Sequence, residues 1–225
     1  MNRYACYCMT RNIYHKVWPS LNSLLQHTEV DKVFLLTEDD DIGYEIPGNV
    51  RIVNVKDQGY FRKDGPNYGT KWTYMVLMRT ALSKVFQKYD RILSLDLDTI
   101  IEEDIGELWD MPIENHYLAG VPEPQNTRDG FVYVNCGVIL WNLAKLRDGK
   151  ADEIIESLNT KRWSFCEQDC VNHLCQGGIY HLSSIYNSNP YTAPTSHPKI
   201  YHFAAQKDWY EYEPRVQKYK EKVEG

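Results

Sequence analysis

Apolar runs rich in β-forming residues alternate with segments of helical periodicity, and this alternation limits the fold more than any other feature. In the first hundred residues the strand-like runs are 4–10, 32–38, 50–55 and 91–98, and the helical segments are 16–27 and 70–89. Strands that alternate with helices of this length are typical of α/β proteins. The sequence therefore predicts a Rossmann-like, mostly parallel central sheet covered by helices.

The second half of the chain carries the same pattern in shorter elements. We expect a short helix, a strand, a strand leading into a helix, a further helix and two short strands, at residues 103–111, 117–121, 133–146, 167–178, 178–182 and 199–204. Gly177 and Gly178 end the last helix, since glycine commonly follows a helix C-terminus. With 225 residues and no linker, the chain is expected to form one α/β domain.

The composition argues against several classes of protein. A formal net charge of −6 disfavours a nucleic-acid-binding protein, because phosphate contacts need a basic surface. No run reaches the ~18 apolar residues that can span a bilayer, so we expect a soluble protein without a membrane span. The six cysteines show no paired CxxC spacing, which favours reduced thiols in a cytoplasmic protein over disulfides or a zinc site.

Two carboxylates end the apolar run "RILSLDLDTII" (91–101). If the strand continues through them, Asp96 and Asp98 point to the same face, where their like charges repel each other. Such a pair either lies in water or binds a cation, and a divalent metal ion resolves the repulsion. Open α/β sheets bind ligands outside the carboxyl ends of their strands, so a site is expected here.

Four ordered segments resemble motifs of the retaining nucleotide-sugar glycosyltransferases of family 8, which include glycogenin and bacterial galactosyltransferases. "LSLDLDTI" is similar to the family's DxD motif, "VNCGVILWNL" to its N-[SA]-G-V segment, "EQDCVN" to its D-Q-D-x-x-N segment and "YHFAAQKDW" to its H-[FY]-x-G-x-x-K-P-W segment. The resemblance runs from residue 4 to about Trp209 and implies one domain of the GT-A type over 1–225. It implies a nucleotide-binding half at 1–110, a sugar- and acceptor-binding half at 111–209 and a small charged C-terminal extension at 210–225, which we expect to be a solvated helix.

The resemblance implies a metal site. Asp96, Asp98 and His202 would be the protein ligands of Mn²⁺ or Mg²⁺, a set of two hard oxygens and one imidazole that is completed by phosphate oxygens. Lys207 would contact the pyrophosphate. The segment departs from the family pattern, because Lys207 lies one residue closer to His202 than usual and an alanine, Ala204 or Ala205, replaces a glycine. The loop is therefore expected to close differently.

The resemblance also places further residues at the donor nucleotide sugar. Arg79 is expected to contact the donor, with Lys71 as the competing candidate, although either could be an ordinary residue of a helix surface. The remaining donor positions are Thr10, Asn12 and Tyr14 near the uracil base, and Asn135, Gly137 and Asn187 near the sugar. An ordinary strand-to-helix turn is the alternative for Thr10 and Asn12, since such residues are common in turns.

Glu167 and Gln168 match an Asp-Gln pair of the family, with Glu in place of Asp. The resemblance implies that the carboxylate binds sugar hydroxyls and that the amide lies near the reacting carbon. A neutral amide is a poor nucleophile, so we expect front-side attack through an oxocarbenium-like transition state, not the two-carboxylate route of a retaining glycosidase. Glu167 could instead serve only to complement the first turn of a helix.

The resulting prediction is a metal-dependent hexosyltransferase that moves glucose or galactose from a UDP-sugar to a sugar or hydroxyl acceptor. Two alternatives stay open. "LSLDLDTII" superficially resembles the D-x-D-x-T start of haloacid-dehalogenase phosphatases, although Thr99 follows Asp98 directly. A non-catalytic protein that binds a sugar nucleotide is the other alternative.

Overall fold

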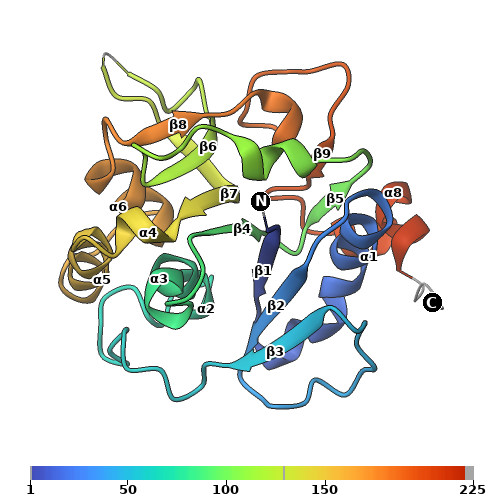
Figure 1. Cartoon of the computed structure of the whole chain (residues 1–225), viewed down its shortest axis with the longest axis horizontal. Coiled ribbons are helices and arrows are strands. Elements are labelled where there is room, and N and C mark those ends of the chain that lie inside the picture. The colour runs from blue at the N-terminus through green and yellow to red at the C-terminus, as the bar shows by residue number, and fades with distance from the viewer. Residues whose placement is uncertain (1, 129, 221–225) are drawn as a thin grey trace.

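The computed structural model describes residues 2–128 and 130–220, and its centre is a seven-stranded sheet with the order β3-β2-β1-β4-β7-β6-β8 (Figure 1). The strands are β1 (Tyr4–Cys8), β2 (Lys32–Thr37), β3 (Val50–Asn54), β4 (Arg91–Leu95), β6 (Leu118–Pro122), β7 (Val134–Asn142) and β8 (Ile179–His181). Strands β3, β2, β1 and β4 are parallel, as are β6 and β8, whereas β7 is antiparallel to β4 and β6. The predicted mostly parallel α/β sheet is confirmed.

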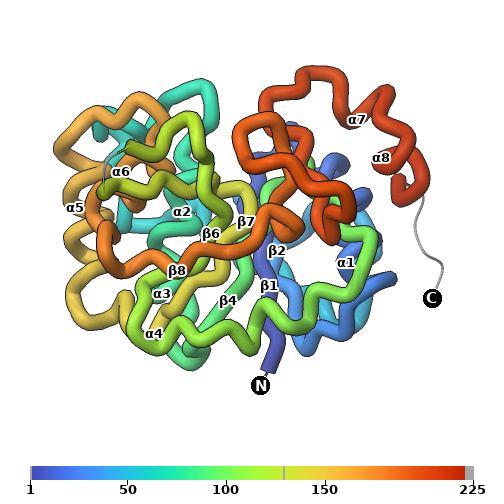
Figure 2. The backbone as a smooth tube through the Cα atoms, turned by 90° about the horizontal axis from the view of Figure 1, so that it is seen from above, coloured from blue at the N-terminus to red at the C-terminus, as the bar shows by residue number. Residues whose placement is uncertain are grey.

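Helices cover both faces of the sheet, as Figures 1 and 2 show. On one face lie α2 (Met75–Met78), α3 (Leu82–Val85), α4 (Leu143–Leu146), α5 (Lys150–Thr160) and α6 (Cys166–Leu174), and on the other lies α1 (Val17–His27). Successive side chains of β1 point to opposite faces of the sheet. Cys6 packs into the core under α2–α6, whereas Ala5 and Tyr7 pack into the core under α1. The two cores hold the strand ends, and hence the residues that follow them, in fixed positions.

A small second sheet lies beside the main one and brings distant segments together. Strand β5 (Thr99–Ile101) pairs antiparallel with β9 (Ile200–His202), and Thr99 lies opposite His202 in the register. Since β5 directly follows Asp96 and Asp98, this pairing carries His202 to the end of β4. The sequence patterns predicted β9 but not β5 as a separate strand.

The prediction of one continuous helix over 70–89 is wrong. Residues 70–74 form turns, and the helical part is divided into α2, the 3₁₀ helix η2 (Arg79–Ala81) and α3. Thr73 has a positive φ of 63°, a conformation that α-helical residues do not adopt, so the helix cannot begin before it. The break at η2 leaves Arg79 at a helix junction facing the end of β4.

Several other elements are shorter or different from those expected. The segment 103–111 forms a 3₁₀ helix, η3 (Gly106–Asp110), and the 3₁₀ helix η1 (Arg11–Lys16) precedes α1. A further 3₁₀ helix, η4 (Ser184–Tyr186), precedes the loop to β9, and the sequence patterns did not identify α5. Each 3₁₀ segment is a connector between elements, as is usual for this kind of helix.

The C-terminal segment is not the solvated helix that the sequence suggested. It forms α7 (Trp209–Tyr212) and α8 (Pro214–Tyr219), and α8 packs against α1 while α7 packs against α8 (Figure 2). Val216 and Tyr219 are buried with Ile100 and Phe203, and the amide of Asn22 donates to the carbonyl oxygen of Tyr219 at 2.9 Å. Apolar burial therefore anchors residues 210–220 to the domain, while the rest of the predicted tail, 221–225, lies outside the described residues.

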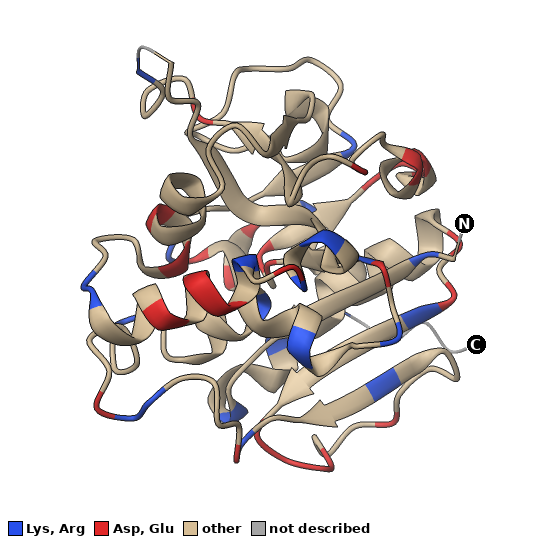
Figure 3. Cartoon of the chain, turned by 60° about the vertical axis from the view of Figure 1, so that its left-hand side comes forward, with Lys and Arg blue, Asp and Glu red and all other residues tan. Residues whose placement is uncertain are grey.

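Basic and acidic side chains of the described residues are mixed over the elements that Figure 3 draws. Figure 3 shows Lys and Arg distributed over many elements and interspersed with Asp and Glu. This distribution agrees with the formal net charge of −6. Among the described residues, no helix combines the length and apolar character needed to cross a bilayer.

Candidate active site

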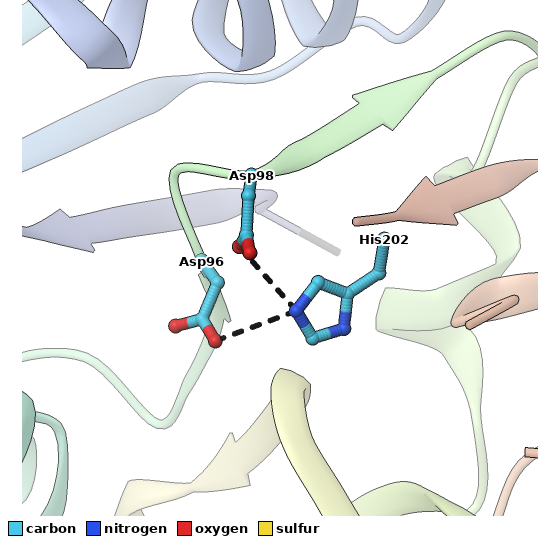
Figure 4. A group of neighbouring side chains, drawn as sticks. All are labelled: Asp96, Asp98 and His202. Carbon is cyan, nitrogen blue, oxygen red and sulfur yellow. Dashed lines mark ion pairs between the residues drawn. The ribbon is translucent and has the colours of Figure 1, made fainter. Parts of the chain in front are cut away.

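Asp96, Asp98 and His202 form the centre of the candidate site (Figure 4). The two aspartates do not continue strand β4, as the sequence argument assumed, but lie in the turn between β4 and β5. Both carboxylates nevertheless face one imidazole: His202 Nε2 lies 3.3 Å from Asp98 Oδ1 and 3.7 Å from Asp96 Oδ2. Ligand atoms of all three residues lie within 4.8 Å of one another.

The position of His202 depends on a glycine. A Cβ atom on Gly137 would lie 2.1 Å from the imidazole Cε1, so only glycine leaves room for the ring over β7. On its other edge, His202 Nδ1 lies 2.8 Å from Asn187 Oδ1. The imidazole is thus fixed between the backbone of β7 and the loop that precedes β9, with 4% of its surface exposed.

The carboxylates and the imidazole shift each other's ionisation. Burial alone would lower the pKa of His202, but the facing Asp98 carboxylate outweighs it and raises that pKa above its usual value. Burial alone would raise the pKa of Asp98, and the neighbouring imidazolium lowers it instead. The imidazole and the Asp98 carboxylate therefore stabilise each other's charged form.

Arg79 adds a buried positive charge beside the cluster. Its guanidinium donates to Asp96 and, through Nη1, to the carbonyl oxygen of Cys136 at 2.5 Å, while Nε lies 3.7 Å from Glu167 Oε1. The side chain is buried, so its charge is compensated by these two carboxylates, not by water. Arg79 thereby holds Asp96 in place and links it to Glu167.

A cavity of about 660 Å³ opens over this cluster. The predicted site residues that line it are Thr10, Asn12, Lys71, Arg79, Asp96, Asp98, Asn135, Gly137, Glu167, Gln168 and His202. A second cavity, of about 760 Å³, is lined by Tyr4 and Arg91 at the other ends of β1 and β4. Because the second cavity lacks the carboxylate cluster, the smaller one is the better candidate for chemistry.

Three predicted residues do not line the cavity. Tyr14 is buried, and its hydroxyl accepts from Glu38 N at 2.8 Å and donates to Asp39 Oδ2 at 3.1 Å. Asn187 is fully buried behind His202. Lys207 is exposed in the turn after β9, outside the lining residues.

Glu167 and Gln168 lie at the start of α6 and line the same cavity as Asp96. Glu167 is 7% exposed, and burial raises the pKa of its carboxyl to about 7 in spite of the nearby Arg79 charge. Gln168 Oε1 accepts from Cys136 N at 2.9 Å, and Nε2 donates to the Tyr133 hydroxyl at 3.2 Å. The amide is therefore held at both ends by the protein.

Several residues that line the cavity could not be identified from the sequence. Glu123 is 2% exposed, and its carboxylate accepts from Asn135 Nδ2 at 2.7 Å and from Asn126 Nδ2 at 2.6 Å. No local signal marks Glu123, which follows β6 in a Pro-flanked turn. Aromatic side chains also line the cavity, namely Trp72, Phe165, Tyr191 and Trp209. Their sequence contexts contain no repeated pattern that would have grouped them.

The sheet order and the position of the site define a GT-A fold, and solved structures of glycosyltransferases share it. The galactosyltransferase LgtC, crystallised with donor and acceptor sugar analogues, matches with a TM-score of 0.73 at 18% identity over 96% of this chain and 95% of that chain. GlyE of Streptococcus pneumoniae matches with a TM-score of 0.74 at 18% identity over 98% of this chain and 60% of that one. Mouse xyloside xylosyltransferase 1 matches with a TM-score of 0.61 at 16% identity over 91% and 98%. At these identities the likeness is one of fold.

The family follows from the sequence itself. The family model for glycosyl transferase family 8 matches residues 4–212, and the chain belongs to that family. A Haemophilus influenzae protein with a provisionally assigned glycosyltransferase name is 25% identical over 126 residues, which cover 50% of this chain and 38% of that protein. The match thus spans well under half the length of this curated relative.

Proposed function

We propose that the protein is a metal-dependent retaining glycosyltransferase that moves a hexose, glucose or galactose, from a UDP-sugar to a sugar or hydroxyl acceptor. The convergence of Asp96, Asp98 and His202 below a cavity is the observation that supports this most strongly. These residues come from segments about a hundred positions apart, so their proximity is a product of the fold and not of local sequence. Family membership supplies the reaction class.

The three side chains fit a divalent cation. Two carboxylate oxygens and one imidazole nitrogen suit Mn²⁺ or Mg²⁺, and phosphate oxygens of the donor can complete the coordination. A cation bound there would neutralise the charge that develops on the nucleoside diphosphate as the anomeric C–O bond breaks. Arg79 keeps Asp96 oriented toward this position through its ion pair.

The donor occupies the cavity in this proposal. Thr10 and Asn12 lie at the end of β1, where the base would bind, and Lys71 supplies a cation at the rim, with its ammonium 4.2 Å from the centre of the Trp72 ring. Lys207 can contact the diphosphate only if the turn after β9 closes over the cavity. Asn135 and Gly137, on β7, would face the sugar. Tyr14 would stabilise the turn that binds the base, since its hydroxyl is hydrogen-bonded to Glu38 N and Asp39 Oδ2.

The residues that would lie near the sugar support the proposed retention of configuration. Gln168 is a neutral amide that is already hydrogen-bonded at both ends, so it stabilises positive charge at the anomeric carbon without forming a covalent bond. The acceptor hydroxyl attacks from the face that the diphosphate leaves, and its proton passes to the departing phosphate oxygen. Glu167, beside Arg79, binds hydroxyls of the transferred sugar.

The two alternatives receive less support. A phosphatase of the haloacid-dehalogenase type needs a threonine two residues after the second aspartate, whereas Thr99 is fully buried and donates to the carbonyl oxygen of Asp96 at 2.8 Å. A non-catalytic binding protein would share the cavity but not the transfer reaction. We also propose a cytoplasmic location; the six cysteines, all within the described residues, form no disulfide, as is usual in that compartment.

Calorimetric titration with UDP, in the presence and absence of Mn²⁺, tests this proposal. We expect binding that requires the metal and that Asp98→Asn abolishes, whereas Asp57→Asn, a change at an exposed aspartate outside the cavity, leaves it intact. Mass spectrometry of UDP-glucose and UDP-galactose incubations then identifies the donor through UDP release. Metal-independent UDP binding would contradict the proposed site, and metal-linked binding without hydrolysis or transfer would favour the non-catalytic alternative.

A further inference from the structure

A chain of buried side-chain amides lies behind His202, on the side away from the carboxylates. Asn187 Oδ1 is 2.8 Å from His202 Nδ1, and Asn187 Nδ2 donates to Asn135 Oδ1 at 2.9 Å. Asn189 Nδ2 donates to Asn187 Oδ1 at 2.9 Å and lies farther, at 3.5 Å, from His202 Nδ1, so the Asn187 oxygen is the nearer partner of that ring nitrogen. Asn187 is 0% exposed, so water does not compete for these bonds.

The neighbours of Asn187 determine which way its amide points. Asn135 Oδ1 also accepts from the backbone N–H of Gly137 at 3.0 Å, so this atom must be the oxygen and Asn187 must present its nitrogen to it. Asn135 Nδ2 donates to the Glu123 carboxylate, which fixes the same orientation independently. The oxygen of Asn187 therefore faces His202.

A second anchor acts from the other side. The backbone N–H of Tyr191 donates to Asn189 Oδ1 at 2.8 Å, which leaves the Asn189 nitrogen to donate to Asn187. The main chain of Asn187 is held as well, since the Thr192 hydroxyl donates to its carbonyl oxygen at 2.9 Å. The acceptor beside His202 is thus fixed by two backbone N–H groups through intervening amides.

An oxygen fixed at this position has a chemical consequence. It accepts a hydrogen bond from Nδ1–H, so a neutral imidazole with its proton on Nδ1 has a free lone pair on Nε2. Nε2 is the atom that faces Asp98 and Asp96. Partners of this kind typically orient metal-binding histidines, and their loss usually weakens metal affinity 10- to 100-fold.

We propose that Asn187 is a positioning residue that binds the Nδ1–H of His202 and so directs the Nε2 lone pair to a cation held by Asp96 and Asp98. This assignment rests on the proposed metal-dependent function and replaces direct contact between Asn187 and the donor. The residue acts through His202, because it is fully buried and absent from the cavity lining.

Two substitutions separate positioning from a purely structural role. Asn187→Asp keeps an oxygen for Nδ1–H but loses the amide donor to Asn135, whereas Asn187→Leu loses both. If Asn187 only stabilises the loop, both variants lose the bond to Asn135 and behave alike. If it positions His202, only the leucine variant loses metal affinity. Asn67→Leu is the matched control, since Asn67 is also 0% exposed, donates to two backbone carbonyls and lies outside the cavity.

The first measurement is Mn²⁺ affinity of the folded proteins by calorimetry, with folding checked by circular dichroism. We expect a loss of about 10- to 100-fold for Asn187→Leu and near wild-type affinity for Asn187→Asp and Asn67→Leu. Equal affinity of the leucine variant and the wild type overturns the inference, as does an equal loss in both Asn187 variants.

The second measurement uses the metal-free protein, so its result does not depend on the proposed function. With ¹⁵N-labelled histidine, and with His202→Gln to assign the signal, NMR should show a hydrogen-bonded Nδ1–H of His202 in the wild type and in Asn187→Asp. Absence of that signal from the wild type overturns the inference, even if the leucine variant does not fold. A wild type that shows the signal but binds no Mn²⁺ refutes the proposed function while leaving the Asn187–His202 contact in place.

Discussion

Substituting Gly137 with alanine places a methyl group against the imidazole of His202. The added Cβ would lie 2.1 Å from Cε1, 2.6 Å from Nδ1 and 2.9 Å from Nε2. Since ordinary van der Waals contact begins at 3.4 Å, the ring must retreat by roughly 1.3 Å (3.4 minus 2.1). Metal–ligand distances in proteins vary by only about 0.2 Å, so a ring displaced this far cannot remain a ligand.

The expected result is a folded protein with weak metal binding. We expect Gly137→Ala to lower Mn²⁺ affinity by at least about 10- to 100-fold, the range seen when groups that orient a ligand are changed. Overpacking should also lower the free energy of unfolding by about 1–3 kcal/mol. Calorimetry with Mn²⁺ measures the first effect and urea denaturation the second.

Gly178→Ala is the matched control for overpacking. Its Cβ would lie 2.6 Å from Cδ2 of Tyr117, outside the cavity, so it should lower stability without changing metal affinity. If Gly137→Ala binds Mn²⁺ as tightly as the wild type while folded, His202 is not held where the site requires it, and the reasoning fails.

Three further predictions concern stability. Ala205 has a positive φ of 62°, so Ala205→Gly should relieve strain worth about 1 kcal/mol and raise Tm by about 2 °C; a lower Tm would count against this. Tyr219 is 2% exposed against α1, so Tyr219→Ala should lower the free energy of unfolding by about 3 kcal/mol, whereas no change would mean that the segment is solvated after all. Burial raises the pKa of Glu167 to about 7, above the unfolded value of about 4.3, so the folded state retains a proton between these values and its stability falls as the pH rises through them. Urea denaturation at pH 4 and pH 8 should therefore show Glu167→Gln gaining about 3 kcal/mol relative to the wild type at the higher pH, and a pH-independent difference would refute the assignment.

The sheet could be predicted because each strand carries its own signal. The runs at 4–10, 32–38, 50–55 and 91–98 are rich in β-forming residues, and each of them contains a strand in the structure, although the fourth strand ends at Leu95. The helix at 70–89 misled because a 3₁₀ turn also brings residues three apart onto one face, so periodicity does not reveal the break at Arg79. The strain at Thr73 has no counterpart in the sequence pattern.

The candidate site likewise contains residues that the sequence predicts and residues that it does not. Asp96 and Asp98 could be found from their position after an apolar run, and His202 from its motif, although the turn that aims both carboxylates at one imidazole could not. The contacts of Glu123 and Asn187 could not be predicted, since their partners are fixed by loops far apart in the chain. The burial of Val216 and Tyr219 likewise depends on a surface that α1 and β5 form only after folding.

The proposed function depends on the binding of one divalent ion by Asp96, Asp98 and His202. Anomalous X-ray diffraction from crystals soaked with Mn²⁺ and UDP tests it directly. We expect one strong manganese peak at about 2.1 Å from an oxygen of Asp96, an oxygen of Asp98 and Nε2 of His202. A crystal with UDP bound in the cavity but no manganese at these three atoms would contradict it.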